Sequence, residues 1–264
     1  MTEIVTFGSL ESFIDNLGED VIKGCIVDTN FAVACLHHMH TFYTDANKSF
    51  KILSDKSVSL FSTHTIRSEF LDIHRKYVLT RKIVELYDEN GRWKGKVKQT
   101  LKDFLEPIVE GIRDSKEEFH FLSDNKLKDI KMEFFPKNES GKAGWIDFCN
   151  YFLATELEDY WKQVEDSFGL NYIKIREEET KIPESKLINE EVKWEEMIKV
   201  VGATGVGTSD AMIVNVFRCS KLPLLITTDF DVAYAVAGSK IAKAVAIPDK
   251  MYERNKQLIK KLLK

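Results

Sequence analysis

The sequence has little that would tie the protein to a membrane, to secretion or to an oxidising compartment. Its four cysteines are widely spaced and form no Cys-x-x-Cys pair, in a chain of 264 residues that is too large to need disulfide bonds for stability. No segment approaches the roughly 18 to 20 consecutive apolar residues of a membrane span, and residues 1–20 lack the basic and apolar segments of an export signal. We therefore expect reduced thiols in a soluble, cytoplasmic protein.

The sequence also lacks an excess of positive charge. Its 38 Lys and Arg residues face 42 Asp and Glu residues, which gives a formal net charge of −4. Bulk electrostatics therefore do not draw the protein to nucleic acid or to a membrane, and any such attraction must come from a local patch. The 44% of hydrophobic residues suffice for one large domain, or for a domain with a sizeable insertion.

Four short apolar segments predict buried β-strands. They follow an expected N-terminal helix and cover residues 25–30, 58–63, 222–229 and 243–248. Helical patterns separate them, and strands that alternate with helices are typical of a parallel sheet covered on both faces. The predicted fold class is therefore α/β, with a central parallel sheet flanked by helices.

A long charged segment interrupts this alternation. Residues from about 91 to 199 offer no convincing strand, whereas residues 146–168 show the periodicity of a helix. The large apolar residues of that helix fall on broadly one side: Phe148, Phe152, Leu157 and Trp161. We predict a single domain, 1–264, with its core at about 20–90 and 200–250 and a mostly helical insertion between the two parts.

Acidic residues lie at or just beyond the ends of three predicted strands. Asp28 closes the first strand, and Glu69 lies on the helix after the second. Asp229 and Asp231 follow the third strand, and Asp210 opens the helix that precedes it. Because the binding crevice of an open parallel sheet lies outside the carboxyl ends of its strands, we expect these carboxylates to point to one place.

Each acid also has a simpler structural explanation, because one acid can cap a helix, complement a helix dipole or form a turn. These roles remain open for Asp28, Asp210, Asp229 and Asp231. Glu69 fits them least, since Ile66 and Ile73 flank it at helical spacing and place it beside the buried stripe of its helix.

Four carboxylates in one crevice would repel each other and raise each other's pKa unless a cation neutralised them. Ligands that are all oxygen select Mg²⁺ or Mn²⁺ over zinc. Such an ion can lower the pKa of a bound water and hold a phosphodiester for in-line attack. The acids together therefore predict a divalent metal centre.

The motifs around these acids resemble those of the PIN domain family, the metal-dependent ribonucleases of the VapC toxin type and their relatives. "IVDTNF", "SEF", "TSDAMIVNVF" and "LLITTDFDVAY" follow each other in the family's order, over roughly residues 20–90 and 200–250. The resemblance implies a three-layer fold and catalytic, metal-binding carboxylates at four positions: Asp28, Glu69, Asp210 and Asp229. Asp231 is the rival of Asp229, and Thr29, Asn30 and Thr228 would line the substrate site.

The segment "GATGVGTS" at 202–209 competes as a phosphate-binding loop. Thr208 stands where that loop requires a lysine, and the residues before it look helical. The simpler interpretation is that its glycines loosen a loop entering the helix of Asp210, which Thr208 or Ser209 can cap.

Two further alternatives are weaker. A haloacid-dehalogenase-like phosphatase would need a second acid two residues after Asp28, where the chain has Asn30. The histidines at 37, 38 and 40 suggest a transition-metal site, but a partly exposed helical face explains them better.

A basic stretch between residues 75 and 102 is the expected RNA contact. Its positive residues are Arg75, Lys76, Arg81, Lys82, Arg92, Lys94, Lys96, Lys98 and Lys102. Within that span they face only Glu85, Asp88 and Glu89, and Tyr77 and Trp93 lie among them. This composition suits phosphate contacts and base stacking, for which we single out Lys94, Lys96 and Lys98, although a solvated helix face and a lysine-rich loop explain it equally well.

We therefore expect a Mg²⁺- or Mn²⁺-dependent ribonuclease that hydrolyses RNA phosphodiester bonds with a metal-activated water. By family analogy it would act as a toxin-type endoribonuclease with an inhibitory antitoxin-like protein, and it would form a homodimer without contact to a membrane. The alternative is a non-catalytic RNA- or protein-binding module that keeps the same fold.

Overall fold

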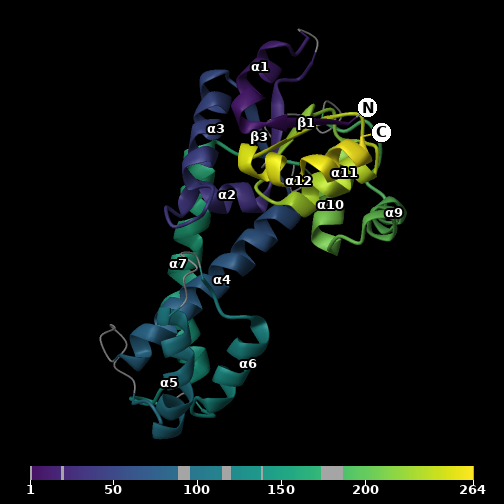
Figure 1. Cartoon of the computed structure of the whole chain (residues 1–264). Helices are drawn as coiled ribbons and strands as arrows, with labels where there is room; N and C mark the ends of the chain where they lie inside the picture. The colour runs from purple at the N-terminus through teal and green to yellow at the C-terminus, as the bar shows by residue number, and fades with distance from the viewer. Residues whose placement is uncertain are drawn as a thin grey trace. The chain divides into compact units, whose positions relative to one another are not determined.

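The computed structural model describes residues 2–18, 21–88, 96–114, 120–137, 139–173 and 187–263. The chain forms two compact units (Figure 1). The sheet unit comprises Met1–Phe70 and Val164–Lys264, and the helical unit comprises Leu71–Gln163.

The sheet unit contains six parallel strands in the order β1-β6-β5-β2-β3-β4. Their bounds are β1 Glu3–Thr6, β2 Gly24–Val27, β3 Ser59–Ser62, β4 Asn171–Tyr172, β5 Leu224–Ile226 and β6 Ala244–Ile247. The four predicted strands are confirmed as β2, β3, β5 and β6. Two strands were not predicted. β1 precedes the expected N-terminal helix, which is present before β2 as α1, and β4 lies in the segment that was expected to have no strand.

Helices cover both faces of this sheet and complete a three-layer α/β fold, as predicted. They are η1 Phe7–Ser9, α1 Leu10–Asp15, α2 Thr29–Leu36, α3 Tyr43–Asp55, α4 His64–Tyr87, α9 Trp194–Thr204, α10 Thr208–Cys219, α11 Phe230–Gly238 and α12 Asp249–Leu262. Every residue of β2, β5 and β6 is buried. Parallel strands with a covered face on each side have this uninterrupted apolar character, which explains why the sequence predicted them.

The chain reverses its direction of travel across the sheet between β2 and β5. From β2 it moves to β3 on one side, and from β5 it moves to β6 on the other. Right-handed crossovers then place α2 and α3 on one face and α11 on the opposite face (Figure 1). The neighbouring strands β2 and β5 therefore form a topological switch point, and ligands of open α/β sheets bind at the carboxyl ends of the strands at such a point.

The link between α9 and α10 explains the glycines at 202–209. Gly205 ends α9 in the left-handed region, at φ +72°, and Gly207 is the N-cap of α10. A helix rather than a strand thus precedes the segment, as predicted.

No single described helix is both long and apolar enough to span a membrane, although α9 and α10 together, across their bend of 119°, have the length and composition to do so.

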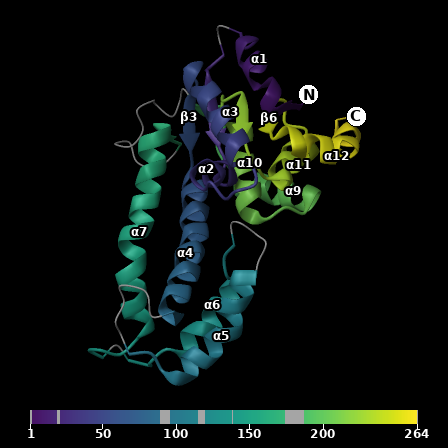
Figure 2. The ribbon, with the colours of Figure 1, turned by 60° about the vertical axis from the view of Figure 1, so that its left-hand side comes forward.

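The helical unit has its own apolar core. Beyond part of α4, it contains α5 Gln99–Asp114, α6 Asp124–Glu133 and most of α7 Trp145–Phe168, and α5 packs against α6 (Figure 2). The predicted helix at 146–168 is confirmed as α7. Phe148 and Phe152 are buried in this core, and Trp161 is buried as well, whereas Leu157 is only half-buried. The unit spans 71–163, so both its ends lie earlier in the chain than those of the predicted insertion.

Candidate metal-type acidic site

Two of the predicted site acids cap helices at the switch point. Asp28 follows β2 and is the N-cap of α2, where its Oδ2 accepts a hydrogen bond from the backbone N–H of Asn30 at 3.3 Å. Asp229 lies three residues after the end of β5 and is the N-cap of α11, where its Oδ1 accepts from the N–H of Asp231 at 2.8 Å. The structural role suggested for Asp28 is therefore real, and capping fixes both side chains at the carboxyl ends of neighbouring strands.

Thr227 and Asn30 join these two acids. The Thr227 Oγ1 donates to Asp28 Oδ2 at 2.7 Å and accepts from the backbone N–H of Asp229 at 2.8 Å. In the other direction, Asn30 Nδ2 donates to Asp229 Oδ2 at 3.0 Å. The two carboxylates are thus held by one hydrogen-bond network that spans β2 and β5.

Glu69 reaches the same region from α4. The N–H of Ile66 donates to the Thr63 hydroxyl at 3.3 Å in the first turn of this helix. The buried Thr29, at the start of α2, donates to Glu69 Oε2 at 2.9 Å and lies 3.3 Å from the Ile66 carbonyl oxygen. The hydroxyl beside Asp28 therefore orients the carboxylate of the neighbouring helix.

Asp210 lies in the first turn of α10. The expected cap at Thr208 or Ser209 is wrong, because the helix already begins at Thr208 and Gly207 is the N-cap without a side-chain hydrogen bond. A Cβ atom on Gly207 would lie only 3.2 Å from Asp210 Oδ2. Glycine at this position therefore leaves room for the carboxylate to lie over the helix N-terminus.

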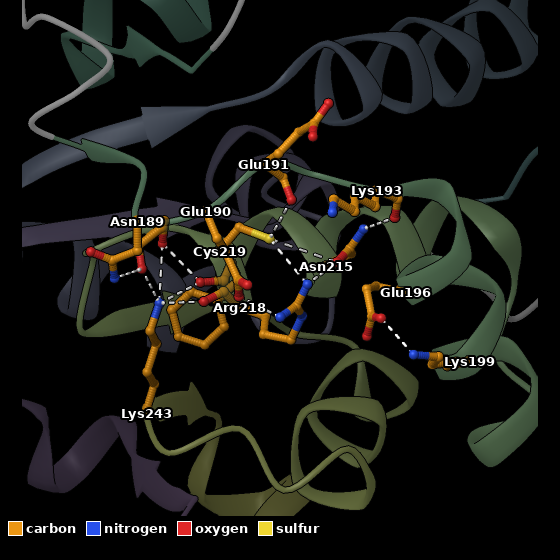
Figure 3. Close-up of polar contacts among 12 residues, drawn as sticks. Asn189, Glu190, Glu191, Lys193, Glu196, Lys199, Asn215, Arg218, Cys219 and Lys243 are labelled. Carbon is orange, nitrogen blue, oxygen red and sulfur yellow. Dashed lines mark hydrogen bonds and ion pairs between the residues drawn. The ribbon is translucent and has the colours of Figure 1, made fainter.

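A polar network anchors α10 at its other end (Figure 3). The Lys243 ammonium, just before β6, donates to the carbonyl oxygens of Phe217 and Ser220. Asn215, in the same helix, donates from Nδ2 to the Lys193 carbonyl oxygen at 2.9 Å. These contacts fix the helix whose first turn carries Asp210.

The carboxylates act on each other electrostatically. Burial raises the pKa of Asp28 to about 7; the Thr227 hydrogen bond lowers it, and the charges of Glu69, Asp229 and Asp210 raise it further. Burial, with the charges of the neighbouring acids, also raises the pKa of Asp210 to about 6. The pKa of Asp229 is raised as well, by burial and by the charge of Asp231. The structure thus brings all five predicted acids into one neighbourhood at the end of the sheet.

Three of the site's acids lack a basic partner among the described residues. Among the described residues, no ion pair joins Asp28, Asp210 or Asp229 to a lysine or arginine. Within the same residues, no group of three or more His, Cys, Asp or Glu side chains is arranged to hold a metal ion. The acids are therefore close enough to perturb each other but do not form a ready-made ligand set.

Sequence reasoning missed the residue that links the two capping acids. Thr228 was assigned to the site, but it is Thr227 that contacts both Asp28 and Asp229. The Thr228 hydroxyl is buried and has no hydrogen-bond partner in the described part of the chain. A usable signal existed, because a threonine two residues before an acid often hydrogen-bonds the backbone in a local turn.

The predicted substrate-binding lysines do not belong to the described part of the sheet unit. Lys94 lies outside the described residues. Lys96 is exposed in an isolated β-bridge with Lys142, and Lys98 donates from Nζ to the Phe134 carbonyl oxygen at 3.0 Å. Both belong to the helical unit, so their assignment as substrate contacts stays a prediction.

Three other cations of the basic stretch form ion pairs. Arg75 and Lys76 both form ion pairs with Asp72 and Asp124, and Lys82 pairs with glutamates 85 and 156. Acids outside the span therefore pair with several of these cations, and the role of the stretch as an RNA contact stays a prediction.

The histidine cluster also differs from expectation. Helix α2 ends at Leu36, and His37 is its C-cap, so the histidines at 37, 38 and 40 follow the helix instead of forming one of its faces.

Comparisons with known proteins give no further information about the site, so its interpretation depends on its geometry. No protein-family model matches the chain, and neither a curated protein sequence nor a solved structure is significantly similar to it. The resemblance of the four motifs to PIN domains therefore stays a hypothesis.

Proposed function

We propose that the acidic cluster is the catalytic centre of a Mg²⁺- or Mn²⁺-dependent ribonuclease that hydrolyses RNA phosphodiester bonds. One observation carries this proposal: Asp28 is buried at the end of β2, where burial raises its pKa, and carboxylates from three other elements, Glu69, Asp229 and Asp210, lie near enough to raise it further. Repulsion of this kind destabilises a fold, so its presence at a topological switch point favours a functional site over a structural one.

The chemistry of the site fits a hard divalent cation. Its donors are carboxylate and hydroxyl oxygens, and no basic side chain neutralises the capping acids in the described part of the chain. The buried Thr228 hydroxyl next to Asp229 has no hydrogen-bond partner among the described residues, which suits a site that also holds water or an oxygen ligand. When bound, such an ion would activate a water and neutralise charge on the phosphate. Because the side chains form no ready-made ligand group, metal binding would require small side-chain rotations.

The surrounding residues have distinct roles in this proposal. Asp28, Glu69, Asp210 and Asp229 would hold the ion, with Asp231 adding negative charge beside Asp210. Thr227 positions Asp28, Asn30 positions Asp229, and Thr29 positions Glu69. Each of the three polar residues donates to a carboxylate oxygen, which stabilises the ionised form that metal binding needs.

A second candidate is a non-catalytic RNA- or protein-binding module. The observation that favours it is the absence, among the described residues, of a preformed group of metal ligands. In this case Asp28 and Asp229 would serve only as helix caps.

The deciding experiment compares cleavage of single-stranded RNA in Mn²⁺, Mg²⁺ and EDTA by the parent protein and by Asp28→Asn and Asp210→Asn. Loss of a key electrostatic group is expected to lower the rate by about a hundredfold or more. Asp55→Asn is the matched control, because this exposed aspartate in α3 lies outside the cluster. This variant should cleave at the parental rate.

Two results would contradict the proposal. If Asp28→Asn cleaves as fast as the parent, Asp28 is not a catalytic ligand. If the parent cleaves no RNA in either metal but binds RNA, the non-catalytic module is the better explanation.

A further inference from the structure

The helical unit contains an open pocket that the acidic site does not use. Its volume is about 600 Å³, within the range of ligand-binding pockets. The lining residues come from the N-terminal side of α5, the end of α6 and the start of α7: Lys98, Lys131, Met132, Phe134, Phe135, Pro136, Lys137, Trp145 and Ile146. Aromatic, aliphatic and lysine side chains thus surround one cavity.

The aromatic side chains of the pocket are held rigidly. The rings of Phe134 and Trp145 meet edge to face, with centroids 5.2 Å apart, and Trp145 stacks on Phe148 at 5.9 Å. Phe134 and Phe148 are buried, whereas Trp145 remains half-buried at the pocket. An indole that packs against two phenyl rings and lines a pocket offers a preformed surface for another planar ring.

The lysines of the pocket differ in how they are used. Lys98 has a structural role, since its Nζ donates to the Phe134 carbonyl oxygen and lies 5.2 Å from the Phe135 ring centroid. Lys131 and Lys137 are exposed, and among the described residues no acid pairs with either of them. These two ammonium groups are therefore available for an anion.

None of the described residues that line the pocket is acidic. The acids next to its lining residues along the chain, Glu133 and Asp147, are not part of the lining. Met132 and Ile146, which do line it, are unusually exposed for aliphatic residues, at 77% and 61%. Exposed apolar surface beside unpaired positive charge is typical of a binding site rather than of a solvated surface.

We propose that this pocket binds single-stranded RNA, with one base stacked against Trp145 and neighbouring phosphates held by Lys131 and Lys137. This inference rests on the proposed ribonuclease function, for which it supplies a substrate-recognition site in the helical unit. Single-stranded nucleic acids are bound by the combination found here, an aromatic stacking surface with cations that follow the backbone. Met132 and Ile146 would pack against the edge of the base and the sugar.

Charge and ring chemistry favour RNA over an acidic peptide as the occupant. A peptide would need a large apolar side chain and acidic residues placed on both sides of it, whereas RNA carries a planar base and phosphates at regular intervals. Both lysines line the same pocket, so two cations are present for the phosphates of one strand.

The test is a fluorescence-anisotropy titration of a fluorescein-labelled oligouridylate in EDTA, over a series of salt concentrations. Lys131→Ala/Lys137→Ala should weaken binding about tenfold or more at low salt. It should also reduce the slope of log K against log salt by about 1.4, because each phosphate contact of a single strand contributes about 0.7. Trp145→Leu should weaken binding by about tenfold without changing that slope, since stacking releases no counterions.

The control is Lys128→Ala/Lys162→Ala, which removes the same charge from exposed lysines of α6 and α7 outside the pocket. Circular dichroism melts establish that each variant folds. An equal loss of affinity in the control pair would overturn the proposal, as would parental affinity in Lys131→Ala/Lys137→Ala. Binding of a glutamate-rich, tryptophan-containing peptide but not of oligouridylate would assign the pocket to a protein partner instead.

Because the titration is done without metal, it separates this proposal from the ribonuclease proposal. If the parent protein binds oligouridylate through the pocket but cleaves no RNA, the pocket proposal is supported and the ribonuclease proposal is contradicted. If the parent cleaves RNA but the Lys131→Ala/Lys137→Ala variant binds RNA as tightly as the parent does, the ribonuclease proposal is supported and the pocket proposal is contradicted.

Discussion

The Thr227 hydroxyl lies 2.7 Å from Asp28 Oδ2 and 2.8 Å from the backbone nitrogen of Asp229, so one buried side chain links the two acids at the switch point. Thr227→Val keeps the shape of the side chain but removes both contacts. We expect the free energy of unfolding to fall by about 1–3 kcal/mol, the usual cost of unpaired buried polar groups. The pKa of Asp28 should rise further, because the lost hydrogen bond lowers it. Urea denaturation and NMR titration measure the two effects.

Thr227→Ser is the control for this prediction, since it keeps the hydroxyl and loses only a methyl group. It should leave the pKa of Asp28 close to the parental value and cost about 1 kcal/mol. A serine variant with a shifted Asp28 pKa, or a valine variant with an unshifted one, would show that the hydroxyl does not control this carboxylate.

Asp28 should make stability depend on pH in the metal-free protein. Its pKa rises from the ordinary 3.8 to about 7 on folding, so the folded state binds more protons than the unfolded state between these values. The free energy of unfolding contributed by Asp28 therefore falls as pH rises through that window and is constant above it. Asp28→Asn removes this dependence.

Both hydrogen bonds to the Asp28 carboxylate reach Oδ2, so an asparagine oxygen at that place accepts them both. In EDTA we therefore expect Asp28→Asn to melt near the parent at pH 5 and about 3 °C or more above it at pH 8, given roughly 2–4 °C per kcal/mol for a chain of this size. Thermal melts at the two pH values measure the difference. If the difference in Tm between Asp28→Asn and the parent is the same at pH 5 and pH 8, or is smaller at pH 8, the raised pKa of Asp28 is contradicted.

Divalent ions that bind the acidic cluster should stabilise the parent most at high pH, where the metal-free protein is least stable. An ion that binds only the folded protein adds about 2.7 kcal/mol at a concentration one hundred times its Kd. Mn²⁺ should therefore raise the Tm of the parent at pH 8 and much less at pH 5, where protons compete for the carboxylates. Asp210→Asn should lose most of the shift. Glu195→Gln, which changes an exposed first-turn acid of α9, should keep it.

The strands that position the site were predictable for a physical reason. All residues of β2, β5 and β6 are buried on both faces, so each strand appears in the sequence as an uninterrupted apolar run. The edge strand β1 was missed because only one of its four residues, Val5, is buried. The strand β4 has two residues, which is too short for any periodicity.

The missed side-chain contacts depend on tertiary structure. The sequence places Thr227 and Thr228 side by side, and the strand end decides which hydroxyl meets Asp28. That register is fixed by pairing with β6, where the Thr227 N–H donates to the Ala246 carbonyl oxygen. The ion pair of Arg75 with Asp124 could not be predicted from the sequence either, because these residues meet only when α4 and α6 pack.

Lys98 should matter for folding more than Lys96 does. The Lys98 ammonium satisfies the carbonyl oxygen of Phe134 and interacts with the Phe135 ring, whereas the Lys96 side chain is exposed. We expect Lys98→Ala to lower the free energy of unfolding by about 1 kcal/mol and Lys96→Ala to change it by less than about 0.5 kcal/mol. Urea denaturation of both variants gives the comparison. Equal effects would show that the Lys98 contacts do not stabilise the fold.

Lys243 should stabilise the helix that carries Asp210. Its half-buried ammonium donates to the Phe217 and Ser220 carbonyl oxygens at the C-terminal end of α10 and lies 4.8 Å from the Phe217 ring centroid (Figure 3). Helix ends leave carbonyl oxygens without partners, and a cation there also complements the helix dipole.

Lys243→Met keeps the apolar stem of the side chain and removes the donor, so it isolates these contacts from packing. We expect the free energy of unfolding to fall by about 1–3 kcal/mol, because two partly buried carbonyl oxygens lose their cationic partner. Lys250→Met, at an exposed lysine in the first turn of α12, is the control and should change it by less than about 0.5 kcal/mol. Hydrogen exchange should show faster opening in the last turn of α10 of the Lys243 variant, while the Ala211 amide, which donates to the Gly207 carbonyl oxygen near the start of the helix, keeps its parental rate. A Lys243→Met protein as stable as the parent would mean that water replaces the ammonium at no cost, and that the position of Asp210 depends on the packing of α10 alone.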